Sequence, residues 1–220
     1  MFTRRCFILG GLAVVGHSRQ APVEDADFSQ WQSFGAGAWT AEGGEIVGRF
    51  DKNKPIPGYL FTREVFTDFR LSVLFRISSG GRSSIYVREP RRKWTVEGDT
   101  RPGSGPDGGY EVLVSYQDPD NPTGTINNIQ KSKKSVGAEE KWTQMDISCR
   151  GSEIRITVAG QLVNRFTQLR VQPGVIGFEV PGTGQQDFTV RFRDIRITSL
   201  PSTSISNTGG YAGLRGAFGV

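Results

Sequence analysis

The sequence contains very little histidine and cysteine. Its only histidine is His17, and its two cysteines are Cys6 and Cys149. His17 and Cys6 both fall in or beside an expected N-terminal export signal, so we expect a mature chain with no histidine and one cysteine. This excludes from the mature chain a Ser-His-Asp triad, a Cys-His pair, a histidine-ligated zinc ion and an intrachain disulfide.

Cys149 belongs to an alternating apolar pattern. It has the same strand parity as Met145 and Ile147. A cysteine in such a position packs as a small apolar side chain, whereas a reactive thiol needs an electropositive, accessible setting. The sequence therefore predicts a buried thiol rather than a catalytic one.

Long apolar runs are also missing, except near the start of the chain. Residues 6–16 form a run of 11 apolar or small residues, too short to span a bilayer, and Arg4-Arg5 precede it. This pattern is typical of a twin-arginine export signal, with an ordinary secretory signal or an uncleaved membrane anchor as alternatives. We expect a signal over residues 1–21, a periplasmic or extracellular protein, and no membrane span in the mature chain.

Much of the excess positive charge lies in that signal. The whole chain has a net charge of +5, and removal of Arg4, Arg5 and Arg19 leaves 24 Lys and Arg against 22 Asp and Glu, a net charge of +2. The basic pI of the full chain is therefore weak evidence for nucleic acid, and no nucleic-acid partner is expected.

Helical periodicity is missing as well, and apolar residues alternate with polar ones instead. From Phe69 to Ile77 every second residue is apolar, which predicts a half-buried strand. Similar segments are expected at residues 84–88, 110–116, 143–148, 153–159, 162–167, 175–180 and 188–197, the last with a bulge near Arg193-Asp194. The sequence thus predicts an all-β antiparallel sandwich or barrel over residues 22–200, followed by a flexible tail over residues 201–220.

The order of short segments along the chain resembles the 3-keto-disaccharide hydrolase domain family over residues 28 to 199. The segments concerned are residues 59–62, 68–71, 75–76, 80–88, 109–112, 123–124, 142, 150–151, 154, 176–178 and 192–197. The resemblance implies a jelly-roll β-sandwich of the concanavalin A-like lectin/glucanase type. It also implies export and cleavage of glycosides oxidised at the sugar 3-position. The chain has Gly81-Arg82-Ser83-Ser84 where the family pattern usually reads Gly-Asn-Ser-Gly.

Glu111 is the expected catalytic carboxylate. It alternates with the apolar Val112, so it should lie on the face of its strand that is not core. Arg88 and Arg76 have the same relation to their strands, and neighbouring strands would bring all three onto one surface. There Glu111 would act as a base and an arginine would stabilise the enolate of a 3-keto sugar. The alternative is an exposed salt-bridge ladder.

Further residues complete the expected site. Within the resembling segments, Tyr86, Ser84 and Thr123 are expected to contact the saccharide, and Trp94 in a long basic loop is expected to stack on a sugar ring. No organic cofactor is expected. The oxygen-rich segment around Asp118 and Asp120 is a weak calcium candidate, with a simple turn as the alternative.

The sequence therefore favours an exported carbohydrate-active hydrolase or lyase with a saccharide ligand. A non-catalytic carbohydrate-binding module and an envelope domain that binds protein are the alternatives. Ordinary glycoside hydrolysis requires two carboxylates, and alternation places only Glu111 on the expected face. A second carboxylate close to Glu111 would favour the enzyme, whereas a flat apolar patch would favour the protein-binding domain.

Overall fold

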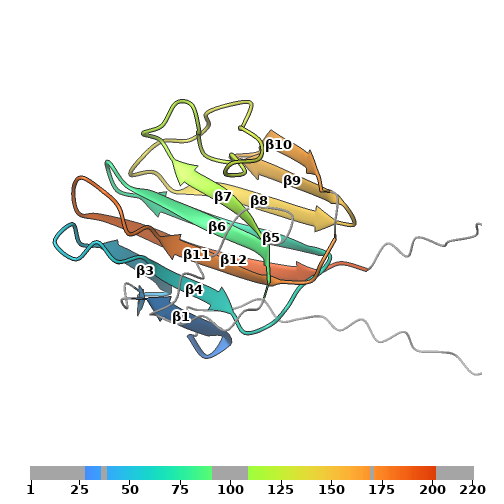
Figure 1. Ribbon diagram of the computed structural model, residues 1–220, viewed down its shortest axis with the longest axis horizontal. Coiled ribbons are helices and arrows are strands. Elements are labelled where there is room, and N and C mark those ends of the chain that lie inside the picture. The colour runs from blue at the N-terminus through green and yellow to red at the C-terminus, as the bar shows by residue number, and fades with distance from the viewer. Residues whose placement is uncertain (1–27, 36–38, 91–108, 169–170, 202–220) are drawn as a thin grey trace, which may run out of the picture.

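The chain folds into two antiparallel β-sheets that pack face to face (Figure 1). The computed structural model describes residues 28–35, 39–90, 109–168 and 171–201. The expected export signal, Trp94 and nearly all of the expected tail lie outside these residues. The predicted β-sandwich is confirmed. Within the described residues the only helical element is a short 3-10 turn, Phe28–Gln30, and no helix is long and apolar enough to cross a bilayer.

The smaller sheet has five strands in the order β1-β4-β11-β6-β7. Their bounds are β1 Trp31–Gly35, β4 Gly58–Thr62, β11 Val175–Val180, β6 Arg82–Glu89 and β7 Tyr110–Ser115. The strands β6 and β11 are far apart in the sequence, and their pairing places β11, from the last third of the chain, in the middle of this sheet.

The larger sheet has seven strands in the order β10-β9-β8-β5-β12-β3-β2. Their bounds are β10 Gln161–Thr167, β9 Glu153–Val158, β8 Thr143–Arg150, β5 Phe69–Ile77, β12 Phe188–Ser199, β3 Glu45–Phe50 and β2 Trp39–Glu42. The predicted meander of β8, β9 and β10 forms one edge of this sheet. Each strand sends alternate apolar side chains towards the other sheet, and these make one continuous core.

Aromatic rings from both sheets meet in that core. Phe178 of β11 stacks on Phe192 of β12 with ring centroids 4.1 Å apart, and Trp31 stacks on Phe178 at 5.2 Å. Cys149 lies in the same core and is fully buried, as its alternation predicts. The core therefore holds the two sheets together mainly by apolar burial.

A β-bulge interrupts β12 where the sequence predicts one. Its pairing with β5 shifts between Arg193 and Arg196, and Asp194 has a φ of 51°. The extra residue lets Phe192 and Ile195 both point into the core. This explains why the apolar parity of the sequence changes within one strand.

A second bulge, in β6, was not predicted and turns Arg88 into the interior. The register of β6 against β11 shifts between Val175 and Gly177, and Arg88 has a φ of 53°. Its fully buried guanidinium pairs with Asp68 at 3.0 Å and donates to the carbonyl oxygens of Thr67 and Gly151 at 2.8 Å each. The expectation that Arg88 lies beside Glu111 is therefore wrong, because the extra residue reverses its side-chain direction.

Replacing Arg88 tests how far this buried pair supports the fold. Arg88→Met leaves the Asp68 carboxylate buried without its cation, so we expect the free energy of unfolding to fall by about 3–5 kcal/mol. Arg76 provides the control, because it is exposed and its Nε lies 3.9 Å from Glu140 Oε2, a long surface ion pair. The Arg76→Met substitution is expected to lower the free energy of unfolding by less than about 1 kcal/mol. Urea denaturation measures both, and equal losses would contradict the assignment.

The thiol of Cys149 is expected to be inert in the folded protein. Burial raises its pKa to about 12, so almost no thiolate is present at pH 8. Iodoacetamide at pH 8 should leave the Cys149 peptide unmodified until urea unfolds the chain, with peptide mass mapping as the readout. Complete alkylation of Cys149 under native conditions would contradict this burial.

Candidate active site

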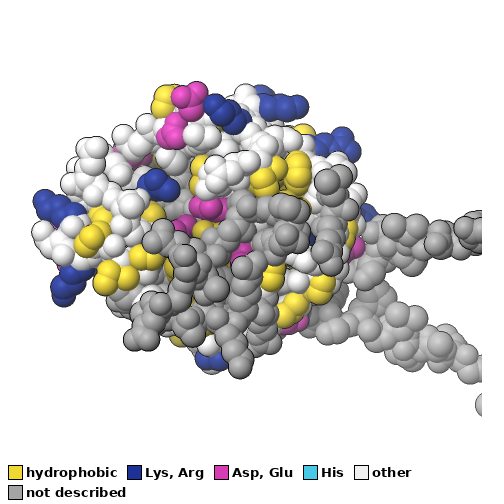
Figure 2. Space-filling view, in the orientation of Figure 1, with side chains coloured by type: hydrophobic (Ala, Val, Ile, Leu, Met, Phe, Trp, Pro, Cys, Tyr) yellow, Lys and Arg dark blue, Asp and Glu magenta, His cyan; other side chains and the backbone are white. Residues whose placement is uncertain are grey.

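The outer face of the five-stranded sheet, which points away from the core, carries two glutamates on either side of β6. Tyr86 of β6 is opposite Glu111 of β7, and Ser84 of β6 is opposite Glu179 of β11. Since Ser84 and Tyr86 are two residues apart, they share this face with both glutamates. Figure 2 views this side of the molecule and shows acidic side chains near its centre, with hydrophobic ones around them.

Glu111 is held at both of its carboxylate oxygens. The Ser84 hydroxyl donates to Oε1 at 2.6 Å, and the Asn127 amide Nδ2 donates to Oε2 at 2.8 Å. The backbone N–H of Asn127 also donates to the Glu111 carbonyl oxygen at 2.8 Å, so the loop after β7 is fixed to the strand. Glu111 is only 8% exposed, and these donors fix its orientation in a partly dehydrated setting.

Glu179 is a second buried carboxylate in the same cluster. Burial and the neighbouring negative charge of Glu111 raise the pKa of Glu179 to about 7. The Tyr86 hydroxyl donates to Glu179 Oε2 at 3.0 Å, which opposes that rise. Burial and the charges of Glu179 and Glu111 hold the pKa of Tyr86 well above its usual value, so Tyr86 remains a hydrogen-bond donor. Near pH 7 a substantial fraction of Glu179 therefore carries a proton.

Aromatic rings adjoin the carboxylates on this face. Tyr59, Phe61 and Tyr86 form a cluster with ring centroids 5.8 to 6.3 Å apart, and Phe34 packs against it. Gly177 makes room for the cluster, because a Cβ built there would lie 2.2 Å from the Phe61 ring. The face thus combines an apolar ring surface with convergent polar groups, which is the usual composition of a saccharide or small-molecule site.

The structure brings together three of the residues expected at the site: Glu111, Ser84 and Tyr86. Thr123 does not join them. It is buried, its hydroxyl donates to the Ser115 carbonyl oxygen at 2.8 Å and it accepts from the Ser115 N–H at 3.0 Å. Thr123 therefore fixes the end of β7 instead of facing a ligand. Trp94 lies outside the described residues.

The arginines occupy other places than expected. Arg88 is buried between the sheets, and Arg76 lies on β5 of the other sheet, where its guanidinium is 5.8 Å from the Trp142 ring. The expected surface with Glu111 and both arginines is therefore wrong, since β5 is not a neighbour of β6 or β7. Arg82 has the strand parity of Ser84 and Tyr86, and its charge acts to lower the pKa of Glu179. It supplies a cation on the site face.

Glu179 is the residue of this candidate site that the sequence analysis did not predict. The sequence predicts a strand over residues 175–180 without assigning a role to Glu179, although Ile176, Phe178 and Val180 alternate and all belong to the core. This alternation places Glu179 on the opposite face, as it does Glu111. The local pattern does not reveal that β11 pairs with β6. This pairing places Glu179 on one side of β6, across from Glu111 of β7 on the other side.

Asp118 and Asp120 form a turn. The Asp118 carboxylate accepts from the backbone N–H groups of Asp120 and Asn121 at 2.9 and 3.1 Å, and the Asn121 side chain lowers the pKa of Asp118. These contacts are typical of an Asx-turn, the alternative to a calcium site. In the part of the chain that the structure describes, no group of three or more His, Cys, Asp or Glu residues is arranged to hold a metal ion.

The chemistry available at this site is proton transfer. Two carboxylates lie on one face, one of them is partly protonated near neutral pH, and each has a hydrogen-bond donor that orients it. Pairs of carboxyl groups whose environments separate their protonation states are the usual basis of general acid and base catalysis.

Comparison with solved structures shows the same fold. A proposed glycosyl hydrolase from Parabacteroides distasonis ATCC 8503 is 16% identical with a TM-score of 0.61, covering 82% of this chain and 98% of that one. A second one from the same organism is 22% identical with a TM-score of 0.57, covering 82% and 83%. The carbohydrate-binding module CBM66 from Bacillus subtilis is 15% identical with a TM-score of 0.53, covering 77% and 96%.

The sequence itself identifies the family. None of the curated proteins matches it at a significant level. The family model for the 3-keto-alpha-glucoside-1,2-lyase-like domain, in contrast, matches residues 20–198, which include every described strand except the last residue of β12. This agrees with the resemblance in the short segments and indicates a carbohydrate-related function. The chain belongs to the 3-keto-alpha-glucoside-1,2-lyase-like domain family.

Proposed function

We propose that the chain is a lyase that cleaves the glycosidic bond of 3-keto-glycosides, with Glu111 as general base and Glu179 as general acid. The observation that carries this proposal is the pair of carboxylates on either side of β6, of which Glu179 is partly protonated near pH 7. The family supports the substrate class. Export of the protein stays a prediction from residues 1–21.

The reaction starts at the carbon between the ketone and the anomeric centre. A ketone at C3 acidifies the C2–H bond, so a single carboxylate is a sufficient base. Glu111 takes the C2 proton, and the electron pair moves onto the C3 oxygen as an enolate. When the enolate collapses, the C1–C2 double bond forms and the C1–O bond breaks, while Glu179 gives its proton to the departing oxygen. The products are an unsaturated keto sugar and an alcohol.

Other groups on the face fit this reaction. The aromatic cluster of Tyr59, Phe61 and Tyr86 supplies an apolar surface for a sugar ring. Arg82 takes the place that was expected for Arg88 or Arg76, because it is a cation with the strand parity of Ser84 and Tyr86. A nearby guanidinium stabilises an enolate as negative charge develops on its oxygen.

Removing either carboxylate is expected to slow cleavage strongly. Glu111→Gln and Glu179→Gln should each lower kcat/KM for a 3-keto disaccharide by about 100-fold or more, because each removes one proton-transfer step. Glu42→Gln, an exposed position on β2 of the other sheet, should leave the rate unchanged. Mass spectrometry of the products distinguishes elimination, which adds no atoms, from hydrolysis, which adds one water molecule.

Two outcomes would refute the proposal. Full turnover by the Glu111→Gln variant would show that Glu111 is not the general base. Binding of the 3-keto disaccharide by the unmodified chain without any product would instead indicate a carbohydrate-binding module. The unoxidised parent disaccharide is the matched substrate control, since it lacks the ketone that acidifies C2–H.

The raised pKa of Glu179 also predicts a pH dependence of stability. Because its folded-state pKa of about 7 lies above the ordinary value of 4.5, the folded chain binds more protons, and the free energy of unfolding falls as pH rises from about 4.5 to about 7. Glu179→Gln should remove this decline and raise stability above pH 7 by up to about 3 kcal/mol. Urea denaturation at pH 5 and pH 8 measures it, and an unchanged pH profile in the variant would contradict the raised pKa.

A further inference from the structure

The outer face of the seven-stranded sheet, on the other side of the sandwich from Glu111, contains an open hollow with a volume of about 310 Å³. Five polar side chains line it: Arg70, Asp146, Ser148, Arg155 and Thr157. These residues come from β5, β8 and β9, three strands that follow one another across the sheet. None of them has a part in the site around Glu111.

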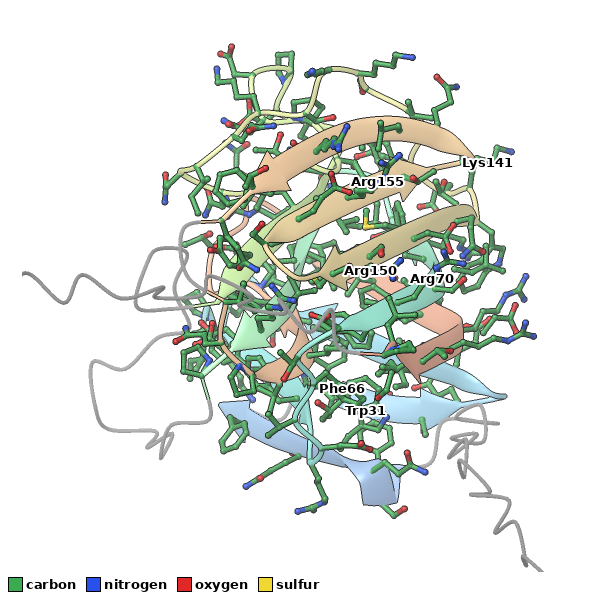
Figure 3. All side chains as sticks on the ribbon, turned by 90° about the vertical axis from the view of Figure 1, so that its right-hand side faces the viewer. Trp31, Phe66, Arg70, Lys141, Arg150 and Arg155 are labelled. Carbon is green, nitrogen blue, oxygen red and sulfur yellow. The ribbon has the colours of Figure 1, made fainter. Side chains whose placement is uncertain are left out.

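Strand register explains why these side chains converge. Ser148 of β8 is opposite both Arg70 of β5 and Arg155 of β9, and in the next row Asp146 is opposite Thr157. Within the hollow, Arg70 therefore lies on one side of Ser148 and Arg155 on the other, with a carboxylate and a threonine in the next row. Figure 3 labels Arg70 and Arg155, which extend from these neighbouring strands.

The charged side chains that line the hollow form no ion pair with one another. Among the ion pairs of the described residues, none includes Arg70 or Asp146. Arg155 lies 3.6 Å from Glu153, which also pairs with Arg165. At the far side of the same sheet, in contrast, Arg191 forms a 2.7 Å pair with Glu45. Arg70 therefore forms no ion pair among the described residues, and Arg155 pairs with Glu153 only through Nη1, so both guanidinium groups still have N–H donors for an external anion.

We propose that this hollow is a second saccharide-binding site, specific for acidic sugars such as uronates. Arginine is suited to a carboxylate because its planar guanidinium can bind both oxygens. The Ser148 and Thr157 hydroxyls and the Asp146 carboxylate are suited to the sugar's own hydroxyl groups, from which a carboxylate accepts hydrogen bonds. The inference is independent of the proposed function, since it concerns the opposite face of the sandwich.

Asp146 is the residue that selects a sugar over other anionic partners. A polyphosphate chain or an anionic lipid surface offers no hydroxyl-rich ring that could donate hydrogen bonds to the Asp146 carboxylate, which lies one row from Ser148. An acidic sugar carries both a negative group and neutral hydroxyl donors on one ring. The mixed charge of the hollow fits that combination.

The test is titration calorimetry of the full chain with a trigalacturonate and with the neutral galactotriose. We expect binding of the trigalacturonate and at least about tenfold weaker binding of galactotriose, because the neutral sugar lacks the charge-assisted hydrogen bonds. Inorganic phosphate serves as the plain anion. Binding of phosphate as tight as that of the trigalacturonate would overturn the proposal, since the sugar hydroxyls would then contribute nothing.

A matched pair of double variants separates a defined site from general electrostatic attraction. Arg70→Gln with Arg155→Gln should weaken trigalacturonate binding about tenfold or more. Arg49→Gln with Arg191→Gln removes the same charge from the same sheet face at β3 and β12, and should change the affinity less than about twofold. Equal losses in the two variants would overturn the proposal, and so would an unmodified chain that does not bind the trigalacturonate.

The Asp146→Asn variant is expected to change the binding affinity in opposite directions for a saccharide and for a simple anion. If Asp146 accepts hydrogen bonds from sugar hydroxyls, the variant binds trigalacturonate about threefold or more weakly, since a neutral acceptor forms weaker bonds. If the hollow only attracts negative charge, removing Asp146 strengthens binding. Stronger binding by Asp146→Asn would therefore overturn the saccharide assignment. Circular dichroism spectra check that all variants fold alike.

Discussion

The pairing of β6 with both β7 and β11 is the constraint on which the proposed active site depends. β7 is the next strand after β6, whereas β11 comes from a distant part of the chain, and their antiparallel registers bring Glu111 and Glu179 to the two sides of Ser84 and Tyr86. At the end of β6, the bulge at Arg88 turns a guanidinium towards Asp68 and Gly151, which connects this strand to the other sheet. One strand thus positions the polar site at its middle and a buried ion pair at its end.

The two outer faces of the sandwich use charge in different ways. On the five-stranded sheet the carboxylates are buried beside aromatic rings, so the repulsion between them is poorly screened and the pKa of Glu179 rises. On the seven-stranded sheet the charged side chains are largely exposed, and many form ordinary surface pairs such as Arg49 with Glu42. Proton-transfer chemistry requires the first setting, whereas recognition of a charged ligand is compatible with the second.

The family and the fold leave room for variation at the site. The two glycosyl hydrolase-like structures and the CBM66 module that share this fold are 15% to 22% identical to the chain, so the likeness to them describes the scaffold alone. Arg82 stands where the family pattern usually has asparagine, and it adds a cation to the site face. Function depends on such local groups more than on the scaffold. We therefore expect family members that differ at the position of Arg82 to differ in substrate.

The sequence by itself determined the strands from β5 onward, because side-chain alternation is a local property that each strand carries in its own residues, whereas β1 to β4 were not predicted. It placed Phe69–Ile77, the bulge near Asp194, the buried Cys149 and the outward direction of Glu111 correctly. Only the tertiary structure decided which strands are neighbours, and with that the partnership of Glu111 with Glu179 and the separation of Arg76 from both. Sheet order and a bulge such as the one at Arg88 arise from contacts between distant segments, which no local pattern encodes.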